Sequence, residues 1–247
     1  MAGQDGLMRG ILFDKDGTIF DFEKTWLPAL RQLALEAAKG DESRAVELLE
    51  AGGFDLKTAK FKSGSIIGAG TTADITRLWY PKLHGSAFAA KAERHDRVFT
   101  KHAASYSVPI DGVGVALDVL AARGFVMGVA TNDTTEGAKA SLLAAGVSRN
   151  LPHVFGADAV AKPKPAPDMV VAFCMAARLN PSEVIVVGDN TLDLEMARSA
   201  GAAMAIGVTS GNSRAEDLSG LADVVLNSIR ELPAFLAAAK ERHQNRK

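Results

Sequence analysis

Two aspartates, Asp14 and Asp16, follow a short apolar run at residues 11–13. An apolar run that ends abruptly in charged residues predicts a buried strand whose C-terminal end opens into a turn. Because alternate residues of a strand share a face, we expect Asp14 and Asp16 to point one way and Lys15 the other. Gly17 permits a sharp turn directly after them. Two carboxylates held this close repel each other, so the pair requires a cation or a shared proton.

A second group of carboxylates follows another apolar run. Residues 184–187 predict a strand, and Gly188, Asp189 and Asp193 come after it. The order of strand, glycine turn and acid repeats the arrangement around Asp14. Hard carboxylate oxygens with room for water suit Mg²⁺. A turn that only caps the strand is the alternative.

Two more polar stretches could bind an anion. Thr131 and Asn132 come directly after a predicted strand at residues 125–130 and open a helix, whose N-terminus attracts anions. The same residue types are also ordinary helix caps. Lys162 and Lys164 lie in a proline-rich stretch before another predicted helix. This composition is also typical of an extended linker with solvated lysines.

From residue 109 onward the sequence alternates between predicted helices and strands. The predicted strands share short apolar runs and are separated by helical segments; they lie at residues 125–130, 184–187, 203–208 and 222–226. Such alternation predicts an α/β protein with a Rossmann-like, mostly parallel sheet and helices on both faces. Sites in these sheets form outside the carboxyl ends of the strands, where the polar groups above are expected to lie.

The segment at residues 21–108 predicts helices and no strand. Its apolar residues recur with helical spacing, for example at Trp26 and Leu30. Residues 68–73 loosely match a dinucleotide-binding glycine pattern, but no strand precedes them, so we expect a glycine-rich turn that opens a helix. This turn, together with residues 63–65, either closes over a substrate and selects it or simply connects two helices.

Composition and charge exclude several classes of protein. The 247 residues carry 28 Lys and Arg against 29 Asp and Glu, a balance that argues against a nucleic-acid or membrane surface. No apolar run approaches the roughly 20 residues that a membrane span needs. The single cysteine, Cys174, forms no internal disulfide, and residues 1–10 lack a secretory signal. We therefore expect a cytoplasmic protein, a monomer or homodimer.

Four stretches carry a family resemblance. The Asp-Lys-Asp-Gly-Thr run from Asp14 to Thr18 resembles the first motif of the haloacid dehalogenase-like hydrolase superfamily, most of whose members are magnesium-dependent phosphatases. Three stretches resemble the later motifs in the same order: Thr131, then Lys164 before Pro-Ala-Pro-Asp, then Gly188-Asp189 with Asp193. The resemblance covers residues 1–20 and 109–247 and implies that they form the hydrolase core. It also implies that residues 21–108 form an all-helical cap domain.

The resemblance implies a role for each matched residue. Asp14 would be the nucleophile that forms an aspartyl-phosphate, and Asp16 the general acid and base. The groups implied to hold the phosphoryl oxygens are Thr131, Asn132, Lys164 and Gly17, with Lys162 as the alternative lysine.

A magnesium site is implied at the same place. Its ligands would be Asp14, the backbone carbonyl of Asp16, and Asp189. Asp193 and Thr18 would support them.

The inserted helices and the first motif are most similar to those of phosphoglycolate phosphatases and β-phosphoglucomutase relatives. We therefore expect a Mg²⁺-dependent phosphatase that acts on a small phosphate monoester, with phosphoglycolate as a candidate. The alternatives are a β-phosphoglucomutase-like phosphomutase and a catalytically inactive binding protein on the same fold.

Overall fold

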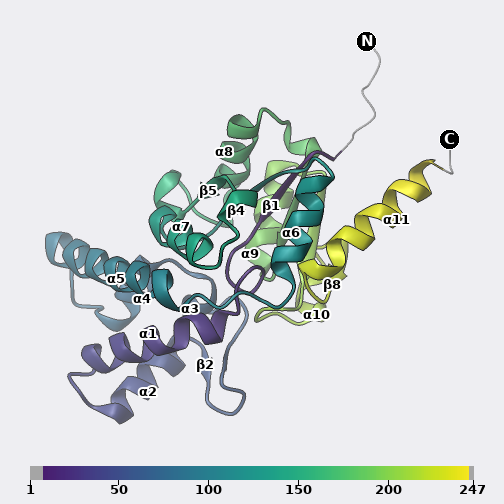
Figure 1. The fold of residues 1–247 in the computed structure, drawn as a ribbon. Coiled ribbons are helices and arrows are strands. Elements are labelled where there is room, and N and C mark those ends of the chain that lie inside the picture. The colour runs from purple at the N-terminus through teal and green to yellow at the C-terminus, as the bar shows by residue number, and fades with distance from the viewer. Residues whose placement is uncertain (1–7, 245–247) are drawn as a thin grey trace.

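A computed structural model describes residues 8–244 and has a parallel sheet at its centre (Figure 1). The six strands lie in the order β5-β4-β1-β6-β7-β8, and every pair is parallel. In chain order they are β1 (Gly10–Phe13), β4 (Val126–Ala130), β5 (His153–Phe155), β6 (Val184–Gly188), β7 (Met204–Val208) and β8 (Val224–Leu226). β1 pairs with β4 on one side and β6 on the other, which is why all four of its residues are buried. The predicted mostly parallel sheet is confirmed.

Helices cover both faces of the sheet. Ile11 and Phe13 of β1 pack against one group of helices, and Leu12 faces the other, as the alternation of a strand requires. The first group is α6 (Val113–Ala122), α7 (Thr135–Ala144) and α11 (Leu232–Gln244). The second is α8 (Asp168–Ala177), α9 (Thr191–Ala200) and α10 (Ala215–Leu218). Short 3₁₀ turns lie at Ser148–Asn150, Ala157–Ala159, Pro181–Glu183 and Ile229–Glu231.

The chain between β1 and α6 forms a second, mainly helical layer with its own hydrophobic cluster. Its helices are α1 (Phe22–Ala37), α2 (Glu42–Ala51), α3 (Ile66–Ala69), α4 (Thr72–Trp79) and α5 (Gly85–Tyr106). Side-chain caps begin several of them: Asp21 caps α1, Asp41 caps α2, and Thr71 forms a capping box with Asp74 at α4.

The expectation that this segment contains no strand is wrong. β2 (Phe54–Asp55) and β3 (Lys60–Phe61) form a small antiparallel hairpin after α2. The Phe54 and Phe61 rings lie 5.0 Å apart, and the backbone N–H of Phe61 donates to Glu23 of α1. Two-residue strands fixed by such tertiary contacts give no alternating pattern that a sequence could reveal.

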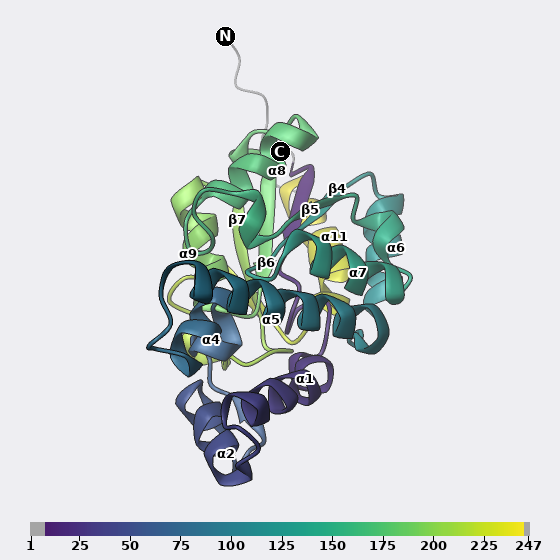
Figure 2. The same cartoon turned by 90° about the vertical axis from the view of Figure 1, so that its left-hand side faces the viewer.

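The helical layer lies over the edge of the sheet at the carboxyl ends of its strands. Figure 2 shows α5 running across this edge beside α7, with α1 and α2 farther from the sheet. In residues 8–244 no helix is long and apolar enough to cross a membrane.

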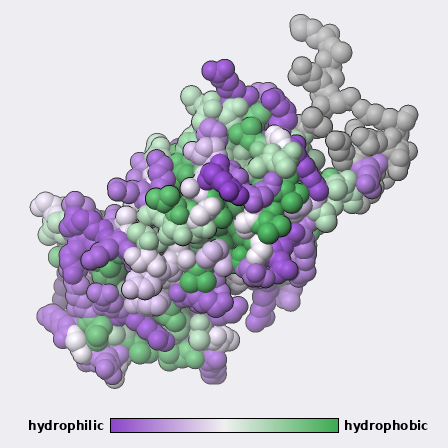
Figure 3. Space-filling model, in the orientation of Figure 1, coloured by the Kyte–Doolittle hydropathy of each residue, from purple (hydrophilic) through white to green (hydrophobic). Residues whose placement is uncertain are grey.

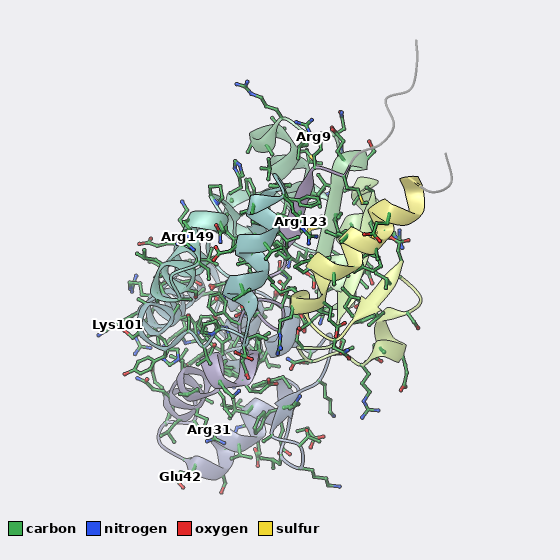
Figure 4. All side chains as sticks on the ribbon, turned by 45° about the vertical axis from the view of Figure 1, so that its right-hand side comes forward. Arg9, Arg31, Glu42, Lys101, Arg123 and Arg149 are labelled. Atoms are coloured by element: carbon green, nitrogen blue, oxygen red, sulfur yellow. The ribbon has the colours of Figure 1, made fainter. Side chains whose placement is uncertain are left out.

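The face of the molecule shown in Figure 3 carries both hydrophilic and hydrophobic residues. Figure 4 shows labelled charged side chains at the periphery, among them Arg31, Lys101 and Arg149. Of the acidic residues that the sequence singled out, Asp14, Asp189 and Asp193 are buried and Asp16 is partly buried.

Candidate active site

Asp14, Lys164, Asp189 and Asp193 come together at the carboxyl end of the central strands. The Lys164 ammonium lies 2.6 Å from Asp14 Oδ1 and 2.6 Å from Asp193 Oδ1. All four residues are buried and line one cavity. Asp14 follows β1, and Asp189 follows the neighbouring β6, so the sheet itself brings these two carboxylates together.

Burial and the repulsion between carboxylates raise the pKa of Asp14 and of Asp189. Burial raises the pKa of Asp14 to about 7; the Lys164 ammonium opposes this shift, and Asp193 and Asp16 add to it. Burial also raises the pKa of Asp189 well above its usual range, with Asp14 and Asp193 adding to the effect. Burial alone would lower the pKa of Lys164, but Asp14 and Asp193 outweigh it, so the ammonium keeps its charge.

The acidic cluster fits a hard divalent cation. Carboxylate oxygens of Asp14, Asp189 and Asp193 lie within 4.8 Å of one another. The Oδ2 atom of Asp14 is buried and has no hydrogen-bond partner within residues 8–244. Mg²⁺ in proteins is bound by oxygen ligands such as carboxylates. This cluster offers only carboxylate oxygens, one of which is buried and unpaired within the described residues. The Asp16 side chain is not part of this cluster. Only its backbone carbonyl is left to act as the magnesium ligand that the resemblance implied.

Asp16 belongs to a neighbouring network built around Lys15. The fully buried Lys15 ammonium lies 2.6 Å from Asp16 Oδ2 and 3.2 Å from Asp133 Oδ2. Trp26 Nε1 of α1 donates to Asp16 Oδ1 at 2.7 Å, and its ring lies 4.7 Å from the Lys15 ammonium. Asp14 and Asp16 line the same cavity, but the expectation that Lys15 points away from Asp16 is wrong. β1 ends at Phe13, so strand alternation no longer applies at Lys15.

Thr131 and Asn132 also line the cavity, directly after β4. The Thr131 hydroxyl oxygen accepts from the Asp133 N–H at 3.1 Å, and its own O–H is free to donate. Asn132 Oδ1 accepts from the Lys164 N–H, and Asn132 Nδ2 donates to the Ala69 carbonyl. Asn132 thus holds the lysine loop and the helical layer in place. Lys162 is exposed, whereas Lys164 is buried beside Asp14.

Gly17 lies behind Asp189 and does not line the cavity. Its N–H donates to the Phe20 carbonyl, and its own carbonyl accepts from Ser210. Its φ is +84°, and a Cβ would lie 2.5 Å from Asp189 Oδ2, so only glycine fits. The expectation that Gly17 binds phosphate stays a prediction. Thr18 is fully buried behind the same turn.

The helical layer closes the cavity from above. Gly68, Ala69 and Gly70 line it. Gly68 and Ala69 belong to the short helix α3, so the glycine-rich turn expected at residues 68–73 is confined to residues 70–71. The hydroxyls of Ser63 and Ser213 lie 2.6 Å apart and join this layer to the loop after β7.

Comparison with known proteins agrees with this geometry. The haloacid dehalogenase-like hydrolase profile matches residues 8–201. The chain belongs to this family. It is 29% identical over 231 residues to the N-acetylmuramic acid 6-phosphate phosphatase of Pseudomonas aeruginosa, covering 91% of this chain and 93% of that protein. It is 28% identical over 193 residues to a phosphoglycolate phosphatase of Xylella fastidiosa, covering 78% of this chain and 77% of that protein.

Solved structures share the fold of this haloacid dehalogenase-like hydrolase. The structure of a predicted phosphoglycolate phosphatase from Haemophilus somnus superposes with a TM-score of 0.71 at 18% identity, covering 95% of this chain and all of that one. The expectation of a hydrolase of this family is confirmed.

Some residues of the candidate site escaped the sequence analysis. Asn212 N–H donates to Asp189 Oδ2 at 2.9 Å, and Ser210 holds Gly17. Both lie after β7, at the same sheet edge, so the rule that polar groups gather at strand ends could have found them. Asp133 comes three residues after β4, so the same rule points to it. Trp26 could not have been found in this way, because only the tertiary structure brings it to Asp16.

Proposed function

We propose that this enzyme is a Mg²⁺-dependent phosphatase that hydrolyses small phosphate monoesters through an aspartyl-phosphate on Asp14. The observation that carries the proposal is the bridge from the Lys164 ammonium to Asp14 and Asp193. It fixes one oxygen of Asp14 and leaves the buried Oδ2 without a partner beside Asp189. A fixed, desolvated carboxylate beside an ammonium is arranged for in-line attack on a phosphate.

Each residue has a distinct part in the reaction. Asp14 attacks phosphorus and releases the alcohol. Asp16 gives the alcohol oxygen a proton, and then takes a proton from the water that hydrolyses the aspartyl-phosphate. Thr131 and Lys164 hold the phosphoryl oxygens and balance their charge.

Mg²⁺ would be held by Asp14, Asp189 and the backbone carbonyl of Asp16, with Asp193 in support. When bound, it supplies positive charge that stabilises the phosphoryl group in the transition state. The carboxylates of Asp14 and Asp189 would then keep their charged form, which burial otherwise opposes.

The test is phosphate release from simple esters by the purified protein, with Mg²⁺ varied, for wild type and Asp14→Asn. We expect Asp14→Asn to lower kcat by about a thousandfold or more, because an amide is no nucleophile. Acid-quenched wild type given a radiolabelled ester should carry phosphate that hydroxylamine releases, and Asp14→Asn should carry none. Asp41→Asn is the control, since asparagine caps a helix as well as aspartate does.

Other outcomes would identify the alternatives. Retention of a tenth of the activity in Asp14→Asn would exclude the covalent route. Transfer of phosphate to another position of the substrate, without release, would indicate a phosphomutase. Binding of a phosphate ester with no turnover at any Mg²⁺ concentration would indicate an inactive binding protein. A cytoplasmic location and the oligomeric state stay predictions.

A further inference from the structure

The cavity that holds the phosphate site continues into a second, apolar chamber under the helical layer. We call it the apolar compartment; its apolar walls are Phe22, Trp26, Leu30, Ile67, Ile75 and Phe99. The two cavities meet at six residues that line both: Asp16, Phe22, Ile67, Gly70, Asn132 and Asp133. Because Asp16 is the proposed acid for the departing alcohol, the alcohol must lie on the side of Asp16 away from Asp14. That side is the apolar compartment.

No cationic side chain of the described residues lines the apolar compartment. The charged groups on its walls are Asp16 and Asp133. Lys15 lies behind them with no exposed surface, and its ammonium is already paired with both carboxylates. An anionic alcohol such as glycolate would therefore meet like charges and no free cation, which disfavours its binding.

A cationic alcohol would have to share both carboxylates with the buried Lys15 ammonium, which already pairs with each of them. Asp16 Oδ1 accepts from Trp26, and its Oδ2 pairs with Lys15. Asp133 Oδ1 accepts from the Thr134 N–H, and its Oδ2 faces Lys15. Moving an ammonium out of water without a hydrogen-bonded partner is costly.

The walls suit a ring or a branched chain. Trp26 and Phe99 meet edge to face with ring centroids 5.6 Å apart, and Leu30 and Ile75 are buried beside them. Aromatic and branched aliphatic walls gain most from an apolar body of the same kind.

From these features we propose that the phosphate ester carries an uncharged leaving group with an apolar body, and that phosphoglycolate is a poor substrate. This inference rests on the proposed phosphatase function and names the substrate class. The charge and the apolar area of the compartment would then select the substrate, in addition to the glycine-rich segment that covers the phosphate.

The experiment compares kcat/KM for four esters of unactivated alcohols at saturating Mg²⁺. Methyl phosphate is the baseline, because a methyl group scarcely enters the compartment. We expect benzyl phosphate to exceed it by about tenfold or more, since a buried phenyl ring adds apolar contact. Phosphoglycolate and phosphoethanolamine should fall below the methyl phosphate baseline.

Two leucines of α1 provide a matched pair of variants. Leu30 lines the compartment, whereas Leu33 does not; both are 1% exposed in the same hydrophobic cluster. Leu30→Ala should lower the ratio of benzyl to methyl phosphate kcat/KM by about threefold to tenfold. Leu33→Ala should keep the wild-type ratio. If either alanine variant fails to fold, Leu30→Val and Leu33→Val replace them. The ratios of kcat/KM among the four esters for wild type test the substrate class without any variant.

The outcomes separate this inference from the proposed function. If kcat/KM for phosphoglycolate or phosphoethanolamine equals that for benzyl phosphate, the inference is overturned. The proposed phosphatase function would remain intact. Equal effects of Leu30→Ala and Leu33→Ala on the ratio would overturn the assignment to the compartment. Turnover of none of the four esters, or activity that survives Asp14→Asn, would overturn the proposed function and this inference with it.

Discussion

Two buried lysines each pair with two acidic residues of the candidate site, and Asp189 pairs with neither. Lys164 pairs with Asp14 and Asp193, and Lys15 pairs with Asp16 and Asp133. Burial alone would lower the pKa of Lys15, but Asp16 and Asp133 outweigh it, so this lysine also keeps its charge. The proposed nucleophile and the proposed acid thus lie in separate networks although only one residue stands between them.

The lysine that balances the nucleophile can be tested by substitution. Lys164→Ala should remove about 2–4 kcal/mol of transition-state stabilisation, because it removes a preorganised charge from a dry site. The loss is measured as a fall in kcat/KM. Lys162→Ala is the control, since Lys162 is exposed and its loss should change kcat/KM very little. Steady-state kinetics with methyl phosphate measure both, after circular dichroism has shown that both variants fold. A larger loss for Lys162→Ala would move the role to that residue.

Trp26 connects the helical layer to the proposed acid. Trp26→Phe keeps an aromatic ring but removes the N–H that donates to Asp16. A hydrogen bond to a charged group contributes about 1.5–3 kcal/mol, so we expect kcat for benzyl phosphate to fall by about tenfold or more. 4-Nitrophenyl phosphate has a ring of similar size but an activated leaving group that needs little protonation, so its kcat should fall much less. Equal losses for the two esters would show that Trp26 does not act through Asp16.

At the scale of elements, sequence patterns predicted most of the sheet and the larger helices. The strands β1, β4, β6 and β7 are continuous apolar runs, which is the pattern of a sheet covered on both faces. Helix starts were also predictable where a side chain caps them, as Asp41 does for α2. Of the site residues, those that follow a strand directly, such as Asp14 and Asp189, were found in the same way.

The elements that were missed are short and depend on distant contacts. β5 has three residues, none fully buried, and is defined mainly by its pairing with β4. The hairpin of β2 and β3 depends on the contact of Phe61 with Glu23 of α1. The Lys15 network was missed for the same reason, because Trp26 reaches Asp16 only when α1 packs over the sheet edge.

Helix α5 contains a buried histidine whose titration should affect stability. His95 is fully buried, its Nδ1 lies 2.9 Å from the Thr76 hydroxyl of α4, and its Nε2 has no partner within the described residues. Burial lowers the pKa of His95 to about 4; Lys91 and Arg94 add to the shift and Glu36 opposes it. Because the folded pKa is lower than the ordinary 6.5, the unfolded chain binds a proton first, so stability is lost as pH falls from 6.5 toward 4.

A His95→Gln variant isolates this contribution. From about pH 7 to about pH 5, wild type should lose about 2 kcal/mol more of its free energy of unfolding than the variant loses. Urea unfolding at the two pH values measures the difference. Parallel losses in the two proteins would show that His95 is not the group that titrates.

At the scale of the whole molecule, the proposed site lies where two hydrophobic clusters meet. One cluster supports the sheet, and the other holds the helices α1 to α5 together. Three side-chain contacts cross the boundary near the site: Trp26 to Asp16, Asn132 to Ala69, and Ser63 to Ser213. The helical layer therefore forms part of the cavity wall. That it is a separate domain, with boundaries at residues 20–21 and 108–109, stays a proposal. We predict that these contacts open to admit the substrate and that the closed arrangement excludes water during the reaction.

The contact between Ser63 and Ser213 allows opening to be tested directly. The two hydroxyl oxygens lie 2.6 Å apart, so a Ser63→Cys, Ser213→Cys double variant places two thiols within reach of a disulfide. Oxidation should lock the helical layer onto the loop after β7 and lower kcat/KM for benzyl phosphate by on the order of a hundredfold, because the alcohol must enter beneath that layer. A reductant should restore the activity. Each single cysteine variant, treated with the same oxidant, is the control, and the natural Cys174 is buried elsewhere, in α8. Full activity in a double variant whose disulfide is confirmed by mass spectrometry would show that the helical layer need not move for substrate to enter.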